Sequence, residues 1–246
     1  MISLRKPGWL FLAGWLLCWW ASPSALAEEA APFPNFSAEY VLKRNGLPLG
    51  NATRSLRSIG NGRYVFESVT YATGMIAWLV KDRIEERSTW TYSGGQLRPL
   101  EYKYDRYGGK KTRRVKLNFD WERRVVTNNI DGDPWRMDIP PNAQDKLLYQ
   151  LAIMQDLKNG RAGLQYNIAD GGRLKNYQFD ILGEETVTTP LGKLKAIKLE
   201  RLGDKRDTTV WCAPSLNYLP VRLEQQESDG SRLSMDIQSV KGLPAR

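Results

Sequence analysis

The side chains that most often carry out catalysis are scarce in this chain of 246 residues. It contains no histidine, which excludes Ser-His-Asp and Cys-His catalysis and removes the commonest metal ligand. Its two cysteines are too few for a cysteine-rich zinc site. No nucleophile elbow, phosphate-cradling loop or dinucleotide-binding motif appears in a suitable setting. The sequence therefore predicts a protein that is not an enzyme and has no catalytic residue, metal site or cofactor.

Acidic pairs offer the remaining chemistry, because two carboxylates can hydrolyse a glycosidic bond without histidine. Glu85-Glu86 and Glu184-Glu185 are such pairs, but neighbours on a strand point to opposite faces of a sheet. Each pair is better explained as a solvated strand face. The acids of segment 131–138, DGDPWRMD, lack the spacing of a calcium-binding loop and fit a hairpin turn.

Positive charge is concentrated in one segment. Between Lys103 and Arg124 there are nine basic residues and three acidic ones. Seven of the basic residues define what we call the basic hairpin: Lys110, Lys111, Arg113, Arg114, Lys116, Arg123 and Arg124. The favoured interpretation is a solvated strand pair whose charges prevent aggregation at a sheet edge. The alternative is a surface for anionic partners such as phospholipid or lipopolysaccharide head groups or acidic glycans.

The segment 142–160 is the clearest helix in a chain that otherwise reads mostly as strand. Asn142 is a suitable N-cap and Asn159-Gly160 a left-handed stop, which together predict a helix over about residues 143–158. Apolar residues lie on nearly all sides of this helix, so it should be buried within a concave sheet. Its apolar stripe and the leucine beside it supply the candidate ligand-binding residues, which are Leu147, Leu148, Leu151 and Met154.

Short segments of alternating polarity make up most of the remaining chain. Phe36, Ala38 and Tyr40 fall on one side of such a segment, a pattern typical of a strand with one buried face. Turn signals such as Asn45-Gly46 separate these segments at short intervals. We therefore expect a mainly β, single-domain protein. Its curved antiparallel sheet should form a barrel or half-open barrel, with the helix packed in or over the hollow.

The first 27 residues read as a cleaved secretory signal peptide. Arg5 and Lys6 form a positive start, residues 8–20 are apolar, and residues 24–27 supply a cleavage site. An uncleaved anchor is the less favoured alternative, because the apolar run is short for a bilayer. Cleavage would leave residues 28–246 as one exported domain that is not transmembrane, with its formal net charge reduced from +9 to +7. In a Gram-negative cell this location is the periplasm, where nucleic acid is not an expected partner.

The tryptophans and the last cysteine have a structural and a functional interpretation. Five tryptophans remain after cleavage: Trp78, Trp90, Trp121, Trp135 and Trp211. Rings on exposed strands can stack on sugars, but aromatic side chains of a β protein more often lie in the core. Cys212, the remaining cysteine, is expected to be a small buried hydrophobe.

The order of several segments resembles a known bacterial family. The leader and the β-hairpins are accompanied by LNFDW (117–121), QDKLLYQLAIMQDLKNG (144–160), TPLGKLKAIKLER (189–201) and YLPVRLE (218–224). In this order the segments resemble the exported family known as Domain of Unknown Function 3108, from about Phe36 to Glu227. The resemblance implies an exported, β-rich protein and brings no active-site residues.

Three functions fit these features. The first is a non-enzymatic periplasmic binding or carrier protein that holds an apolar or amphipathic, lipid-like envelope ligand under the helix. The second is a structural or interaction module of envelope assembly whose hollow is filled by its own side chains. The third and least favoured is a carboxylate-dependent hydrolase of cell-wall glycans. Free volume in the hollow decides between the first two.

Overall fold

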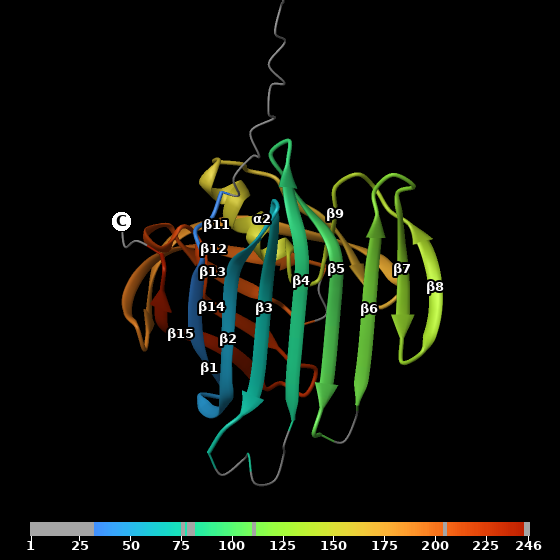
Figure 1. Cartoon of the computed structure of the whole chain (residues 1–246). Helices are drawn as coiled ribbons and strands as arrows, with labels where there is room; N and C mark the ends of the chain where they lie inside the picture. Colours follow the sequence, from blue (N-terminus) through green and yellow to red (C-terminus); the bar gives the residue numbers. More distant parts are fainter. Residues whose placement is uncertain (1–31, 75–76, 78–81, 110–111, 204–205, 244–246) are drawn as a thin grey trace, which may run out of the picture.

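Fifteen strands form one sheet in the computed structural model of the protein (Figure 1). The structure describes residues 32–74, 77, 82–109, 112–203 and 206–243, so the predicted leader lies outside the described residues. The strands are β1 (Phe36–Arg44), β2 (Leu47–Gly60), β3 (Arg63–Ala72), β4 (Arg83–Ser93), β5 (Gln96–Tyr107), β6 (Arg113–Asp120), β7 (Val125–Ile130), β8 (Asp133–Asp138), β9 (Ala143–Asp145), β10 (Leu164–Asp170), β11 (Arg173–Thr189), β12 (Gly192–Leu202), β13 (Thr209–Ala213), β14 (Leu219–Gln226) and β15 (Arg232–Lys241). Helix α2 spans Tyr149–Lys158, and the short 3-10 helix η1 spans Pro214–Leu216.

The sheet folds over on itself to make two layers. Its strand order is β8-β7-β6-β5-β4-β3-β2-β1-β15-β14-β13-β12-β11-β10-β9, so strands that are neighbours in sequence are mostly neighbours in the sheet. In Figure 1, β1 to β8 form the front layer and β10 to β15 cross behind it. The ladders are antiparallel, apart from the short parallel pairing of β9 with β10. Because β8 and β9 remain as edges, the sheet is curved but not closed, so of the two predicted forms, a barrel or a half-open barrel, the structure has the second.

Burial along β1 follows the predicted alternation. Phe36, Ala38 and Tyr40 are all buried and belong to the core between the layers. The turn after β1 also lies where the sequence signals it, since Asn45 adopts a positive φ of 49°. Asp131 does the same between β7 and β8, so the prediction of a hairpin turn in that acidic segment is confirmed.

The helix is shorter than predicted. α2 begins at Tyr149, because the residues Ala143–Asp145 form β9 against β10. Gln144 strengthens this arrangement by donating a hydrogen bond from Nε2 to the carbonyl oxygen of Leu97 in β5, at 2.8 Å. Pairing with distant strands thus outweighs the local capping signal, and the prediction of Asn142 as the N-cap is wrong.

Different groups cap the two ends of α2. Asp145 Oδ1 accepts hydrogen bonds from the backbone N–H groups of Leu147 and Leu148, at 2.8 and 2.7 Å, in the turn that leads into the helix. At the far end the N–H groups of Asn159 and Gly160 bond to carbonyl oxygens of the last turn, and Gly160 has a φ of 69°. The predicted Asn159-Gly160 stop is therefore confirmed.

Helix α2 is buried between the layers, as its apolar sides predict. Leu151 and Met154 are 0% and 1% exposed. The helix also presents Tyr149 to an aromatic cluster, where its ring stacks on Phe179 and meets Tyr177 edge-on, with centroids 6.4 and 5.4 Å apart. The interior around α2 is therefore filled by the protein's own side chains.

The tryptophans divide between core and surface. Trp90 and Trp211 are buried in the core, while Trp135 on the edge strand β8 is 39% exposed. Trp78 lies outside the described residues. Cys212 is fully buried, which confirms its prediction as a small hydrophobe, and burial raises the pKa of its thiol.

Candidate functional site

The four residues predicted to bind an apolar ligand lie in the core. Leu147, Leu148, Leu151 and Met154 have exposed fractions of 1%, 0%, 0% and 1%. None of them lines the clefts that are described below. In this conformation they stabilise the fold, and a ligand would reach them only if α2 moved away.

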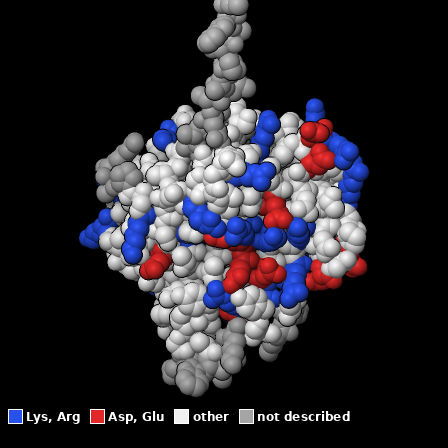
Figure 2. Space-filling model, in the orientation of Figure 1, with Lys and Arg blue, Asp and Glu red and all other residues white. Residues whose placement is uncertain are grey.

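Three of the five described members of the basic hairpin lie close to acidic side chains. Arg114, Lys116 and Arg123 each have a carboxylate oxygen nearby, at 3.7, 2.9 and 3.3 Å. Figure 2 shows the same interleaving of basic and acidic groups over the front face of the molecule. Such exposed pairs contribute at most about 1 kcal/mol each, but they reduce the charge that these three residues offer to a partner. Lys110 and Lys111 lie outside the described residues.

Two members of the basic hairpin have no carboxylate partner among the described residues, and they lie in different settings. Arg124 occupies the turn between β6 and β7 with a φ of 53°, and its carbonyl oxygen accepts a hydrogen bond from the N–H of Ile139 at 2.9 Å. Arg113 instead reaches Gly171 in the turn between β10 and β11. The described members of the basic hairpin therefore have different surroundings.

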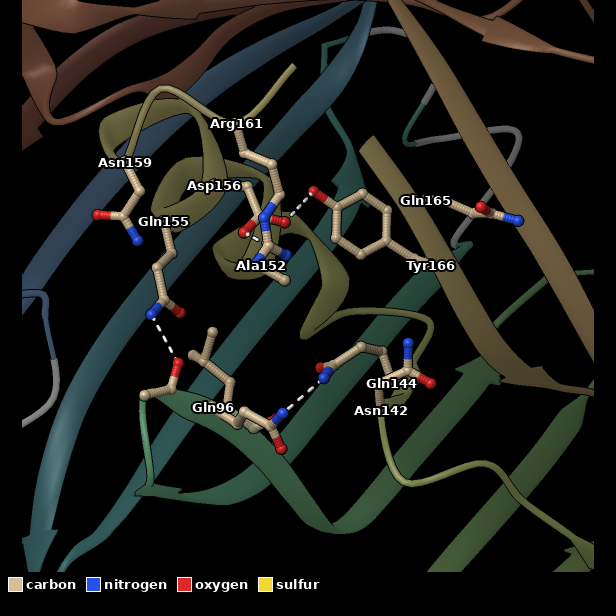
Figure 3. A pocket seen from close by; sticks show the side chains of 12 residues that line it. Gln96, Asn142, Gln144, Ala152, Gln155, Asp156, Asn159, Arg161, Gln165 and Tyr166 are labelled. Carbon is tan, nitrogen blue, oxygen red and sulfur yellow. Dashed lines mark hydrogen bonds and ion pairs between the residues drawn. The ribbon is translucent and has the colours of Figure 1, made fainter. Parts of the chain in front are cut away.

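A polar cleft lies where several segments meet (Figure 3). The start of β5, the segment around β9, the second half of α2 and the strand β10 enclose about 150 Å³. The lining residues are Gly95, Gln96, Leu97, Asn142, Gln144, Ala152, Gln155, Asp156, Asn159, Arg161, Gln165 and Tyr166. Half of them carry a side-chain amide, and we call this site the amide cleft.

Two glutamines of the amide cleft are fixed by hydrogen bonds to β4, to β5 and to the turn between them. Gln155 donates from Nε2 to the carbonyl oxygen of Gly95 at 2.9 Å and to Tyr92 Oη at 3.1 Å. Gln144 donates from Nε2 to the carbonyl oxygen of Leu97. Because both amide nitrogens are engaged, the Oε1 atoms are left as acceptors.

Gln144 has an acceptor that the described residues leave unused. Its side chain is 7% exposed, and Oε1 has no hydrogen-bond partner in the described part of the chain. A buried acceptor without a partner costs about 1–3 kcal/mol, so such atoms are few in folded proteins. Oε1 itself has almost no accessible surface, so a donor in the cleft that Gln144 lines would reach this atom only after a small movement of the lining.

Asp156 is the single carboxylate among the described residues that line the amide cleft. It accepts a hydrogen bond from Tyr166 Oη at 2.9 Å, and Arg161 Nη1 lies 3.1 Å from its other oxygen (Figure 3). Burial raises the pKa of Asp156, against the opposing effects of Tyr166 and Arg161. Burial also raises the pKa of Tyr166, which keeps its phenol protonated as a donor. Glycosidases use two carboxylates, so the cleft offers binding groups rather than a catalytic pair.

The sequence alone does not predict the amide cleft. Its residues come from the segments 95–97, 142–144, 152–161 and 165–166, which only the fold brings together. One signal was available, namely the polar residues Gln155, Asp156 and Asn159 near the end of an otherwise apolar helix.

Metal clusters are absent from the part of the chain that the structure describes, where no three His, Cys, Asp or Glu side chains are placed to hold an ion. Across those same residues, no helix combines the length and the apolar character needed to cross a membrane.

Both the fold and the sequence match known proteins. The structure resembles the β-barrel-like protein of Domain of Unknown Function DUF1849 from Brucella abortus, with a TM-score of 0.56 and 9% identity, over 86% of this chain and 99% of that chain. At this identity the likeness shows the fold alone. A comparison with curated proteins finds no match. The family model described as "Protein of unknown function (DUF3108)" matches residues 36–238, so the chain belongs to this family, as the order of its segments predicts.

Proposed function

We propose that the protein is a non-enzymatic binding protein of the cell envelope, exported to the periplasm, whose amide cleft holds a hydroxyl-rich part of its ligand. The observation that carries this proposal is the buried Oε1 of Gln144, which lacks a donor among the described residues. A ligand hydroxyl can supply that donor once the lining of the cleft shifts enough to uncover the atom. The other amides of the cleft, with Arg161 and Asp156, offer the mixed donors and acceptors that sugar hydroxyls require.

The size of the amide cleft limits what it can hold. Its volume is about 150 Å³, whereas pockets for drug-sized ligands measure about 300–1,000 Å³. The space corresponds to about five water molecules at about 30 Å³ each. A single sugar ring, or the polar head of a larger molecule, is therefore the expected occupant.

A lipid bound in the hollow requires a different conformation. Exposing Leu147, Leu151 and Met154 would cost roughly 5–9 kcal/mol, at about 1.5–3 kcal/mol for each side chain. The stability of a whole domain is about 5–15 kcal/mol, so this movement would use much of it. We therefore favour binding with α2 in place. An amphipathic envelope ligand still fits when its polar head occupies the amide cleft and its chain lies outside.

A structural or interaction module of envelope assembly is the second candidate. It is favoured by the filled interior, in which the helix and both layers share one core. On this hypothesis the amide cleft holds water, and partners bind the outer surface. A glycan hydrolase is less well supported, because the described lining of the cleft provides one carboxylate.

Sugar binding by the purified, folded protein tests the proposal. Glucose, N-acetylglucosamine and soluble peptidoglycan fragments are titrated while the side-chain amide signals are followed by NMR. We expect saturable shifts of the Gln144 and Gln155 amides, and loss of binding in Gln144→Leu. Gln178→Leu is the matched control, because Gln178 lies exposed on β11 and does not line the cleft.

A variant at the rim separates binding from folding. Gln144→Leu also removes the hydrogen bond to Leu97, so its thermal unfolding must be recorded alongside. Gln165 lines the cleft but is exposed, so Gln165→Ala should weaken binding without a change in stability. The proposal is wrong if no probe shifts the cleft amides, or if Gln178→Leu loses binding as fully as the cleft variants.

A further inference from the structure

The two layers are in contact at the edge strand β8. The turn between β10 and β11 packs against β8, because a Cβ on Gly172 would lie 2.2 Å from the ring of Trp135. A Cβ on Gly171 would lie 3.4 Å from Arg113 Nη2. Trp135 and Arg113 of the front layer therefore lie directly over this turn of the rear layer.

A small pocket lies beside this contact, and we call it the seam pocket. Its lining residues are Tyr102, Tyr104, Arg113, Val115, Lys146, Asp170 and Gly171. They come from β5, β6, the turn before α2 and the end of β10, so both layers contribute to it. The seam pocket has a volume of about 70 Å³, or about two water molecules, which suits one small charged group.

Two cations of the seam pocket form no close ion pair with a carboxylate of the described residues, although their charges act on Asp170 from a longer distance. Neither Arg113 nor Lys146 forms an ion pair with another residue that the structure describes. Lys146 Nζ lies 5.6 Å from the centroid of the Tyr104 ring, an arrangement that holds the ammonium group over the aromatic face. Both cations come from exposed residues, so they can receive an anion without a rearrangement of the core.

The acid that lines the seam pocket is already neutralised. Lys175 Nζ lies 2.6 Å from Asp170 Oδ2. Burial raises the pKa of Asp170, but the hydrogen bond from Lys175 and the charges of Lys146 and Arg113 outweigh this effect and lower it overall. The field in the seam pocket is therefore positive.

A larger cleft shares part of its lining with the seam pocket. It has a volume of about 330 Å³ and is lined by Tyr104, Arg106, Thr112, Arg113, Ile130 and Asp131. Tyr104 and Arg113 line both spaces, so a ligand can place a charged group in the seam pocket and its remainder in the cleft. Arg106 is held by Asp82 through two hydrogen bonds of 3.0 and 2.5 Å and adds little unpaired charge.

We infer that the seam pocket binds a phosphate group, either free or carried by an envelope lipid. Arg113 and Lys146 supply charge-assisted donors, and the fork of a guanidinium suits phosphate oxygens. This site uses none of the residues of the amide cleft, so it goes beyond the proposed function and can fail independently of it. It gives Arg113 a role distinct from that of Arg114, Lys116 and Arg123, whose charges are paired on the surface.

Calorimetric titration of the folded protein with inorganic phosphate tests the inference. Arg113→Gln and Lys146→Gln should each weaken phosphate binding by at least about tenfold, since each removes a charge-assisted hydrogen bond. Arg123→Gln is the matched control, because it removes the same charge from the same hairpin outside the seam pocket, and it should bind as the parent does. An equal loss in all three variants would show attraction to net charge alone and overturn the inference.

Vesicles distinguish a free phosphate from a lipid head group. Phosphatidylcholine vesicles with and without phosphatidate are sedimented with the protein and the same three variants. Phosphatidate-dependent binding that Arg113→Gln and Lys146→Gln weaken, and Arg123→Gln does not, assigns the phosphate to a lipid. Binding of inorganic phosphate alone, with the same pattern, assigns the free anion. Absence of binding in both experiments overturns the inference.

Discussion

Ser88 donates a hydrogen bond from Oγ to Asp145 Oδ2 within the filled interior and thereby joins β4 to β9. Both residues are 0% exposed. The other oxygen of Asp145 accepts the N–H groups of Leu147 and Leu148, so one carboxylate ties the start of α2 to the front layer. Burial raises the pKa of Asp145 to about 6, although these hydrogen bonds oppose the rise. The helix is thus anchored by the Asp145 carboxyl group, whose ionisation is unfavourable in the folded protein.

Asp145→Asn should increase the stability of the protein at neutral pH. The folded pKa lies above the ordinary value of 3.8, so the contribution of Asp145 to stability is present below about pH 4 and lost as the pH rises through about 6. About two pKa units correspond to roughly 3 kcal/mol. Asparagine keeps an oxygen for the two N–H groups and carries no charge. Urea unfolding across this pH range should give a flatter profile for the variant than for the parent.

Two further variants check this explanation. Ser88→Ala removes a donor to the carboxylate, so it should destabilise the protein more at pH 7 than at pH 4. Asp170→Asn should instead destabilise the protein at neutral pH and have less effect in acid. The pKa of Asp170 is lowered, so the contribution of its carboxylate to stability is lost as the pH falls. The explanation fails if Asp145→Asn destabilises the protein equally at every pH.

The limits of α2 show what the sequence could and could not predict. The distribution of apolar residues correctly indicated a buried helix, because burial follows from the side chains of the segment itself. The start of the helix was misplaced, since Asn142 is a good local N-cap. Residues 143–145 instead pair with β10 and with Leu97, and no local pattern reveals partners that distant.

For the candidate site residues, too, the sequence predicts some features, whereas others depend on the fold. The basic hairpin was recognised from its composition, but the register of β5 and β6 decides which of its charges are paired. Lys116 meets Glu101 because the two strands lie side by side, whereas Arg113 faces the rear layer. The amide cleft and the seam pocket each combine segments from both layers, so neither could be found before the fold was known.

Leu151→Ala should lower the free energy of unfolding by about 2–5 kcal/mol, because it opens a cavity beside a fully buried helix. Leu174→Ala is the control. Leu174 is 42% exposed on β11, so its loss should change stability by no more than about 0.5 kcal/mol. Chemical denaturation of both variants measures the difference. Similar small losses in the two would mean that α2 is not packed between the layers in solution.

Glu101→Gln should destabilise the front layer in a salt-dependent way. Glu101 bridges Lys103 and Lys116, each at 2.9 Å, and these two lysines lie directly opposite each other in the ladder of β5 and β6. Without the carboxylate the like charges repel, and we expect a loss of about 1 kcal/mol after allowing for solvent screening. The loss should shrink at high ionic strength.

The control for Glu101→Gln is Glu184→Gln. Glu184 lies 3.8 Å from Lys195 with both side chains largely exposed, so its removal should have no measurable effect. Urea unfolding in low and high salt measures both variants. A loss in Glu101→Gln that salt does not change would mean that packing, not charge, is responsible.

Gly172→Ala should destabilise the protein more than Gly171→Ala. Both glycines have positive φ, at 84° and 57°, so either alanine carries a backbone penalty of about 1–2 kcal/mol. At Gly171 the new Cβ meets only the flexible end of Arg113, which can move. At Gly172 it would overlap the ring of Trp135, and overpacking adds about 1–3 kcal/mol.

Trp135→Ala provides the test of this contact, because it removes the ring that Gly172→Ala would displace. Trp135→Ala alone should lower the free energy of unfolding, because packing is lost. In a protein that already carries Trp135→Ala, adding Gly172→Ala should cost only as much stability as Gly171→Ala costs in the parent. A double-mutant cycle of unfolding free energies measures the coupling, which is expected to exceed about 0.5 kcal/mol for residues in contact. Additive effects would mean that the turn between β10 and β11 does not rest on β8, and that the two layers are not joined at the seam pocket.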